Sequence, residues 1–216
     1  KYLLEEGFTV HATVRDQNRS ASVAHLHKAA QGTPGVLKLF DADLVKPGSF
    51  DAAVQGCELV IHTASPFIIK GFDSAYEALV RPAVEGTENV LKACTAASGV
   101  RRVVLTSSVA SIYGDAVESL KLPQQRFTEA QWNNTSSEKH QPYSYSKVAA
   151  ERKAWELCKA QSSWDMVTIN PALVVGPSLT TNTQSTSIDI MRDLGSGRQR
   201  TGVPHLEFGV VDVREV

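Results

Sequence analysis

Hydrophobic and polar positions divide this chain into two kinds of segment that alternate from end to end. Short runs rich in Val, Ile, Leu and Thr predict strands, and longer mixed runs with apolar residues at helical spacing predict helices. The expected strands are residues 8–15, 36–40, 58–63, 102–108 and 165–170. The expected helices are residues 23–30, 76–97, 143–160 and 188–194.

Cap and breaker residues locate some of the helix ends. Gly7 suits the end of a helix that contains Leu3 and Leu4. Ser49 is expected to cap a short helix that runs through Val54. Pro82 predicts a kink or a restart inside the helix at 76–97.

Alternating strands and helices are typical of an α/β protein. Several expected strands are almost wholly apolar, which indicates a parallel sheet buried on both faces, in a doubly wound arrangement. No internal repeat or linker is visible, so we expect residues 1–216 to form one domain core. The chain starts without Met, inside an expected helix, and it ends without a stop signal. We therefore expect the fold to be truncated at both ends.

Composition excludes several classes of partner. Of the 216 residues, 42% are hydrophobic and the formal net charge is −1, which favours neither nucleic acid nor an anionic membrane surface. No apolar run reaches the roughly 18 residues of a membrane span. Cys57, Cys94 and Cys158 are odd in number and far apart, so they predict no disulfide framework and no metal site. They fit a reducing compartment, and we expect the cytoplasm.

Tyr143 and Lys147 are the first candidates for chemistry. Four residues apart on a helix, they lie on one face, one turn from each other. A phenol normally keeps its proton up to a pH of about 10, and a neighbouring ammonium is expected to lower that pKa. Tyr145 is two residues from Lys147 and should point elsewhere. Because the spacing is common on exposed helices, other residues must complete the site.

Arg15 follows the first expected strand, and ligands of doubly wound sheets bind at the carboxyl ends of strands. In dinucleotide-binding folds, the residue that contacts the adenosine ribose lies about 20 residues after a glycine-rich turn. That turn would lie upstream of Lys1. An arginine at this place favours NADP over NAD, although Asp16 could accept a ribose hydroxyl and Arg15 could simply be a surface residue.

Small or polar residues follow the other strands. Asp43 could accept from an adenine amino group or form a turn. Thr63, Ala64 and Ser65 are small enough to let the backbone approach a flat cofactor ring. Ser108 could donate a hydrogen bond into the same crevice or cap a loop. The stretch at 171–174 could form a wall beside a nicotinamide.

Seven segments together carry a family resemblance. They are residues 12–16, 41–44, 62–66, 104–108, 127–132, 143–151 and 170–177. In this order the chain resembles the extended short-chain dehydrogenase/reductase (NAD-dependent epimerase/dehydratase) family, which has a Rossmann-type fold. It is most similar to the dihydroflavonol 4-reductase and cinnamoyl-CoA reductase branch, which includes fungal and yeast aldehyde/ketone reductases.

The resemblance implies a role for each matching residue. Ser108, Tyr143 and Lys147 match the catalytic triad, and Tyr143 and Lys147 also lie at the cofactor. Arg15 matches the contact to the NADP 2′-phosphate. The matches to adenine contacts are Asp43 and Leu44. The matches to ribose and nicotinamide contacts are Thr63, Ala64, Ser65 and Thr106, and those to the nicotinamide wall are Pro171, Ala172, Leu173 and Val174.

The implied activity is hydride transfer from NADPH to a ketone or aldehyde, giving an alcohol. The implied partner is a small carbonyl compound, bound by a monomer or homodimer without a metal; NAD(H) is the less favoured cofactor. Residues 176–216 would begin the substrate-binding region, and 208–213 resemble the strand that leads into it. The glycine-rich loop is absent, and Ala83 stands where many relatives have an Asn used in a proton relay.

Two other functions stay open. One is an epimerase or dehydratase that acts on a nucleotide sugar and retains NAD; Arg15 and the turn at 63–66 argue against it. The other is a non-catalytic NADP-binding protein, which the joint presence of Ser108, Tyr143 and Lys147 disfavours.

Overall fold

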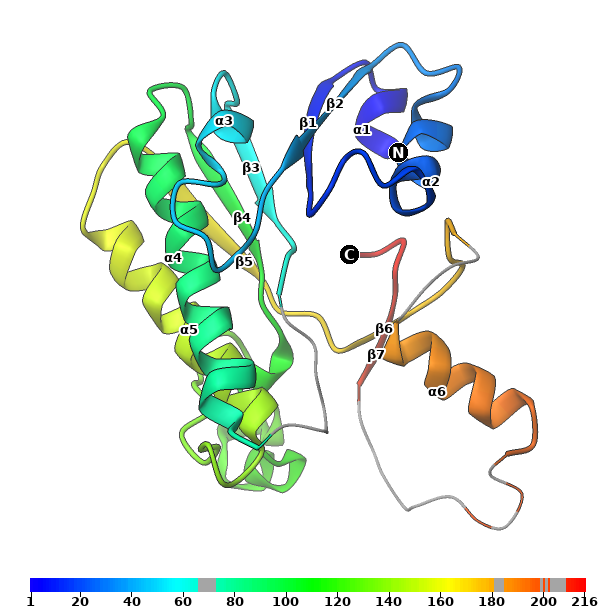
Figure 1. The fold of residues 1–216 in the computed structure, drawn as a ribbon. Helices are drawn as coiled ribbons and strands as arrows, with labels where there is room; N and C mark the ends of the chain where they lie inside the picture. The colour runs from blue at the N-terminus through cyan, green and yellow to red at the C-terminus, as the bar shows by residue number, and fades with distance from the viewer. Residues whose placement is uncertain (66–72, 181–184, 199, 201, 203–208) are drawn as a thin grey trace.

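The computed structural model confirms an α/β fold with parallel strands (Figure 1). It describes residues 1–65, 73–180, 185–198, 200, 202 and 209–216. The strands are β1 (Thr9–Val14), β2 (Val36–Asp41), β3 (Leu59–His62), β4 (Arg102–Thr106), β5 (Asp165–Ile169), β6 (Leu173–Val175) and β7 (Val210–Asp212). Every strand pair is parallel.

The expected helices are present at nearly the expected places. The α-helices are α1 (Tyr2–Glu5), α2 (Ser20–Ala30), α3 (Asp51–Val54), α4 (Arg81–Ala96), α5 (Pro142–Lys159) and α6 (Thr186–Gly195). A π-helical turn, η1 (Tyr76–Val80), leads into α4, and the 3₁₀ turns of the described residues are η2 (Val109–Ser111), η3 (Ala116–Lys121) and η4 (Pro123–Gln125). Among the described residues, no helix is long and apolar enough to cross a membrane.

The structure confirms the prediction for Pro82 but not the one for Ser49. Pro82 lies in the first turn of α4, directly after η1, so the helix restarts there as expected. A proline has no N–H to donate to the preceding turn, and it lies where the π-helical pattern of η1 gives way to the α-helical pattern of α4. Ser49, however, does not cap α3, which Phe50 precedes. Its hydroxyl instead donates to the backbone oxygen of Asp43 at 2.7 Å, closing the turn after β2.

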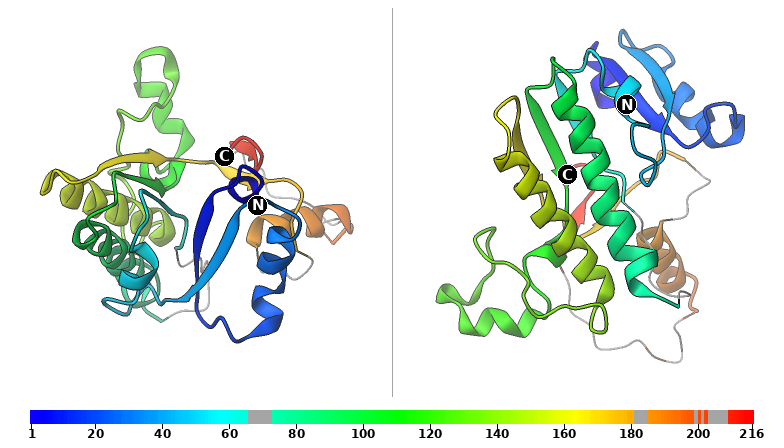
Figure 2. Two further views of the ribbon diagram at one scale, coloured as in Figure 1. Left: turned by 90° about the horizontal axis from the view of Figure 1, so that it is seen from above. Right: turned by 60° about the vertical axis from the view of Figure 1, so that its left-hand side comes forward.

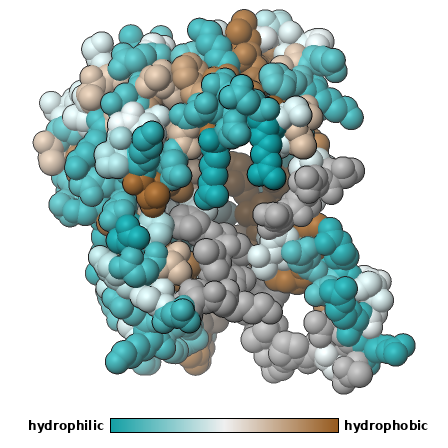
Figure 3. All heavy atoms as spheres, viewed as in Figure 1, coloured by the Kyte–Doolittle hydropathy of each residue, from teal (hydrophilic) through white to brown (hydrophobic). Residues whose placement is uncertain are grey.

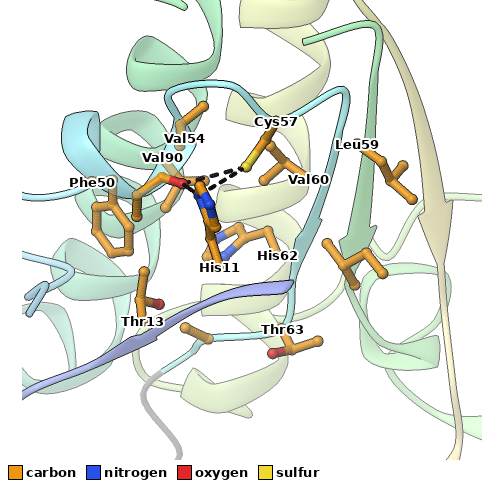
Figure 4. Close-up of a pocket in the computed structure, with 13 residues that line it drawn as sticks. His11, Thr13, Phe50, Val54, Cys57, Leu59, Val60, His62, Thr63 and Val90 are labelled. Carbon is orange, nitrogen blue, oxygen red and sulfur yellow. Dashed lines mark hydrogen bonds between the residues drawn. The ribbon is translucent and has the colours of Figure 1, made fainter. Parts of the chain in front are cut away.

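Among the described residues, the strands form three hydrogen-bonded groups rather than one continuous sheet: β1 with β2, β3 with β4 and β5, and β6 with β7. None of the described strands lies between β1 and β3. A cavity of about 110 Å³ separates them, and Figure 4 shows His11 and Thr13 of β1 opposite Val60 and His62 of β3. The two facing strand edges therefore leave a gap in the sheet.

The core lies between the central group of strands and two long helices. α4 and α5 pack side by side against one face of β3–β4–β5 (Figures 1 and 2). Val103 of β4 and Leu91 of α4 are fully buried there. Because strand residues alternate between faces, Ile61 and Val167 lie on the opposite face, where they are 47% and 41% exposed.

Apolar residues are also exposed at the amino-terminal ends of β1 and β3. Phe8 is 58% exposed and Leu59 is 45% exposed, and both line a cavity of about 520 Å³. Figure 3 shows a mostly hydrophilic face with apolar residues near its top, where these strand ends lie in Figure 1. The carboxyl ends of the strands lie at the opposite edge, and the candidate site is there.

Candidate active site

Helix α5 positions the two residues with which the site begins. It starts at Pro142, whose fixed φ angle suits the first turn of a helix. Tyr143 and Lys147 follow on the same face, and the Lys147 ammonium nitrogen lies 5.7 Å from the centre of the Tyr143 ring. Lys147 is only 8% exposed, so its charge lies inside the protein.

Ser108 reaches the same place from β4. Its backbone is extended at the start of η2, and its side-chain Oγ accepts a hydrogen bond from the Ala110 N–H at 3.2 Å. The Ser108 and Tyr143 side chains also share a hydrogen bond. The structure therefore brings the three expected catalytic residues together at the carboxyl end of β4.

Burial decides the protonation of Tyr143. It raises the pKa of the phenol to about 12, although the hydrogen bond with Ser108 acts in the opposite direction. The expectation of a pKa below the usual value is therefore wrong, because the loss of water around the phenolate costs more than nearby groups return. At neutral pH Tyr143 keeps its proton and can donate it.

Burial also shifts the pKa values of Lys147 and His62. It lowers both, because the charged form of each side chain is the protonated one. Burial lowers the pKa of Lys147 to about 8, and the Lys147 ammonium nitrogen donates to Ser65 Oγ at 3.0 Å. His62 ends β3 and is 5% exposed. Its pKa is lowered to about 4, first by burial and then by the charge of Lys147, so its ring is neutral at physiological pH. The site thus contains one buried cation and a neutral imidazole.

Three of the expected nicotinamide and ribose contacts lie beside this cation, and the others lie elsewhere. Ala64, Ser65 and Thr106 line a small cavity of about 20 Å³ together with Lys147. Thr63 is exposed and lines the cavity between β1 and β3. Pro171, Ala172, Leu173 and Val174 are half-buried, and the Pro171 oxygen accepts from the Val109 N–H at 3.1 Å.

The expected adenosine contacts lie further away, after β1 and β2. Arg15 is exposed, while the Asp16 carboxylate accepts from the Asn18 N–H at 2.9 Å. The Asp43 carboxylate accepts from the Val45 N–H at 3.0 Å, so it forms the turn that was its alternative interpretation. Leu44 is half-buried against the hydrophobic core. A role of these residues at the cofactor stays a prediction.

Sequence reasoning assigned no role to Glu151, although the structure buries it beside the triad. Glu151 lies one turn after Lys147 on α5, and its carboxylate accepts hydrogen bonds from Ser107, Ser111 and Asn170. A glutamate four residues after the expected catalytic lysine was the signal available in the sequence. Within the described part of the chain, no three His, Cys, Asp or Glu side chains are grouped so that they could hold a metal ion.

Comparison with known proteins places this site in a family. The model of the NAD dependent epimerase/dehydratase family matches residues 1–205. A cinnamoyl-CoA reductase from Medicago truncatula is 40% identical over 219 residues, which cover 100% of this chain and 64% of the relative. A putative anthocyanidin reductase from Ginkgo biloba is 41% identical over 202 residues, which cover 91% of this chain and 57% of the relative.

A solved structure agrees with the sequence relatives. Yeast methylglyoxal/isovaleraldehyde reductase in complex with NADPH superposes with a TM-score of 0.82 at 26% identity, over 99% of this chain and 66% of that one. The chain thus spans less than two thirds of the length of these relatives. The resemblance in the sequence is confirmed: the chain belongs to the NAD-dependent epimerase/dehydratase family.

Proposed function

We propose that the protein carrying this chain is an NADPH-dependent reductase that converts a ketone or aldehyde to an alcohol. The observation that carries the proposal is the hydrogen-bonded pair of Ser108 and Tyr143 beside the buried ammonium of Lys147. All three lie at the carboxyl ends of parallel strands or on the helix packed against them, where such folds bind their ligands.

Each member of the group has a task in that reaction. The substrate oxygen would lie between the Ser108 and Tyr143 hydroxyls. Ser108 donates a hydrogen bond that holds this oxygen and stabilises the charge that develops on it. Tyr143 gives its proton to the forming alkoxide, and its raised pKa keeps that proton available at neutral pH.

Lys147 fits a role at the cofactor ribose. An ammonium has three N–H donors, and Ser65 accepts one of them. Ribose hydroxyls would accept the others and return part of the solvation that Lys147 loses on burial. Bound NADPH would supply the hydride, while the protein positions the reacting groups.

Arg15 supports NADPH over NADH. It is an exposed guanidinium directly after β1, where the 2′-phosphate of NADP would be met. Guanidinium groups suit phosphates because they offer paired N–H donors. We further propose that residues 176–216 begin the region that binds the substrate.

The test is net oxidation of NADPH by the purified intact protein. A panel of aldehydes and ketones is added, and the NADPH absorbance is followed with NADH in parallel. We expect loss of NADPH with at least one carbonyl compound and slower loss of NADH. An epimerase or dehydratase that retains NAD would convert a nucleotide sugar without net oxidation, and that result with no carbonyl reduction would overturn the proposal.

A further inference from the structure

Glu151 lies on the same face of α5 as the proposed catalytic residues. It follows Lys147 by four residues and Tyr143 by eight, so the three side chains occupy successive turns. Glu151 is 6% exposed. A buried carboxylate is tolerated only when hydrogen bonds replace the water that it has lost.

Four donors supply those hydrogen bonds. The Oε2 atom of Glu151 accepts from the hydroxyls of Ser107 and Ser111, each at 2.5 Å, and from the Asn170 amide at 2.9 Å. The other oxygen, Oε1, accepts from the Trp155 indole N–H at 3.3 Å. Hydrogen bonds to a carboxylate are about twice as strong as those between neutral groups. Oε2 therefore joins α5 to the ends of both β4 and β5.

Two of these donors flank Ser108. Ser107 continues the β4–β5 ladder, where its N–H donates to the Ile169 oxygen at 2.8 Å. Ser111 ends η2, three residues after Ser108. Asn170 reaches the same turn, because its amide nitrogen lies 3.2 Å from the Ser108 backbone oxygen. The Glu151 carboxylate thus binds both ends of the turn at 107–111, through Ser107 and Ser111, and binds Asn170 after β5 as well.

The hydroxyl, amide and indole groups around Glu151 all have hydrogens to donate, and they suit a side chain that accepts on both of its oxygens. Ser111 has one hydroxyl hydrogen and two acceptors in reach, the Ser108 oxygen at 2.7 Å and Glu151 Oε2. The Asn170 amide nitrogen has three acceptors in reach for its two hydrogens: the Ser108 oxygen, Ser111 Oγ and Glu151 Oε2. When these hydrogens go to the Ser108 oxygen and Glu151, the Ser111 hydrogen is left for Glu151. A glutamine at 151 would direct its NH₂ group at a donor, whichever way its amide is turned.

We propose that Glu151 is a positioning residue for the carbonyl reduction. Its carboxylate holds the turn at 107–111 so that the Ser108 hydroxyl meets Tyr143 and the substrate oxygen. The inference rests on the proposed function, because it concerns the geometry of the same site. It assigns Glu151 an effect that passes through Ser108 rather than through the substrate.

A double-mutant cycle tests this coupling. In the intact protein, Glu151→Gln is expected to lower kcat about 10- to 100-fold, the scale of a misplaced reacting group. The dissociation constant for NADPH is expected to stay within about twofold, because the ribose contacts of Lys147 remain. In a Ser108→Ala background, Glu151→Gln is expected to lower kcat less than about threefold, since residues that act as a unit are not additive.

Two controls keep the result interpretable. Glu156→Gln changes an exposed glutamate on the same helix and is expected to leave kcat unchanged. Ser111→Ala removes one donor and keeps Glu151. It is expected to lower kcat in the wild-type background and to lower it less in the Ser108→Ala background. It replaces Glu151→Gln in the cycle if that variant does not fold.

The outcomes separate this inference from the proposed function. An equal fold-change in both backgrounds, or an unchanged kcat in Glu151→Gln, overturns the positioning role while the wild-type protein still reduces carbonyls. A wild-type protein that reduces no carbonyl overturns the proposed function, and the inference fails with it.

Discussion

Lys147 carries a buried charge, and replacing it should stabilise the protein while it abolishes function. Its pKa is lowered from 10.5 to about 8 by burial. At about 1.4 kcal/mol for each pKa unit, folding with the lysine charged costs about 3 kcal/mol more than folding with it neutral. Lys147→Met keeps most of the aliphatic length and removes the charge.

The expected gain at pH 7 is smaller than this cost. The variant also loses the hydrogen bond from Lys147 to Ser65, which contributes about 1 kcal/mol. The free energy of unfolding should therefore rise by about 2 kcal/mol. Because the folded pKa lies below the unfolded one, the cost of the charge is fully present below pH 8. It disappears as the pH rises from about 8 to 10.5, and the advantage of the variant disappears with it.

Urea unfolding of both proteins at several pH values measures this difference. Taking the difference between variant and wild type removes the contribution of every other group that titrates equally in both. Lys159→Met, an exposed lysine at the end of the same helix, is the matched control and should show little change at any pH. A Lys147→Met protein that is less stable than wild type at pH 7, or a difference that does not depend on pH, would refute the reasoning.

The same structure predicts the pH dependence of the activity, the effect of Arg15 on cofactor choice and the contribution of Leu91 to stability. The kcat/KM for NADPH should fall as the pH rises through about 8, where Lys147 of the free protein loses its proton, and a profile of kcat/KM that stays flat to pH 10 would contradict this. Arg15→Gln should raise the KM for NADPH about tenfold, the scale of one lost charged hydrogen bond, and leave the KM for NADH unchanged in steady-state assays. Leu91→Ala, at a fully buried site between α4 and the sheet, should lower the free energy of unfolding by about 2–5 kcal/mol in urea, with exposed Leu120→Ala as the control.

Local pattern was sufficient to predict most of the elements. The run at 102–108 predicted β4, and helical spacing at 143–160 predicted α5 to within one residue at each end. The short strand β6 was missed, because three residues give no usable period. The gap between β1 and β3 could not be predicted either, because alternation of apolar residues does not say which strands pair.

The site was predictable where spacing or strand ends fix geometry. Tyr143 and Lys147 are neighbours because a helix makes them so, and Ser108 joins them because it ends a central strand. The pKa of Tyr143 was predicted in the wrong direction, since the extent of its burial depends on packing that the sequence does not state. The role of Glu151 was not predicted, because its donors Ser107 and Asn170 lie before and after α5 in the sequence and meet only in the folded chain.

Single-turnover reduction by Tyr143→Phe tests the central claim most directly. The intact protein is loaded with NADPH and mixed with the best carbonyl substrate of the panel, and the loss of NADPH is followed in one turnover. We predict that Tyr143→Phe reacts about 10²–10⁴-fold more slowly than wild type, the loss expected for a missing general acid. Tyr145→Phe, on the same helix, should react at the wild-type rate. A Tyr143→Phe protein that reduces the carbonyl as fast as wild type would contradict the account.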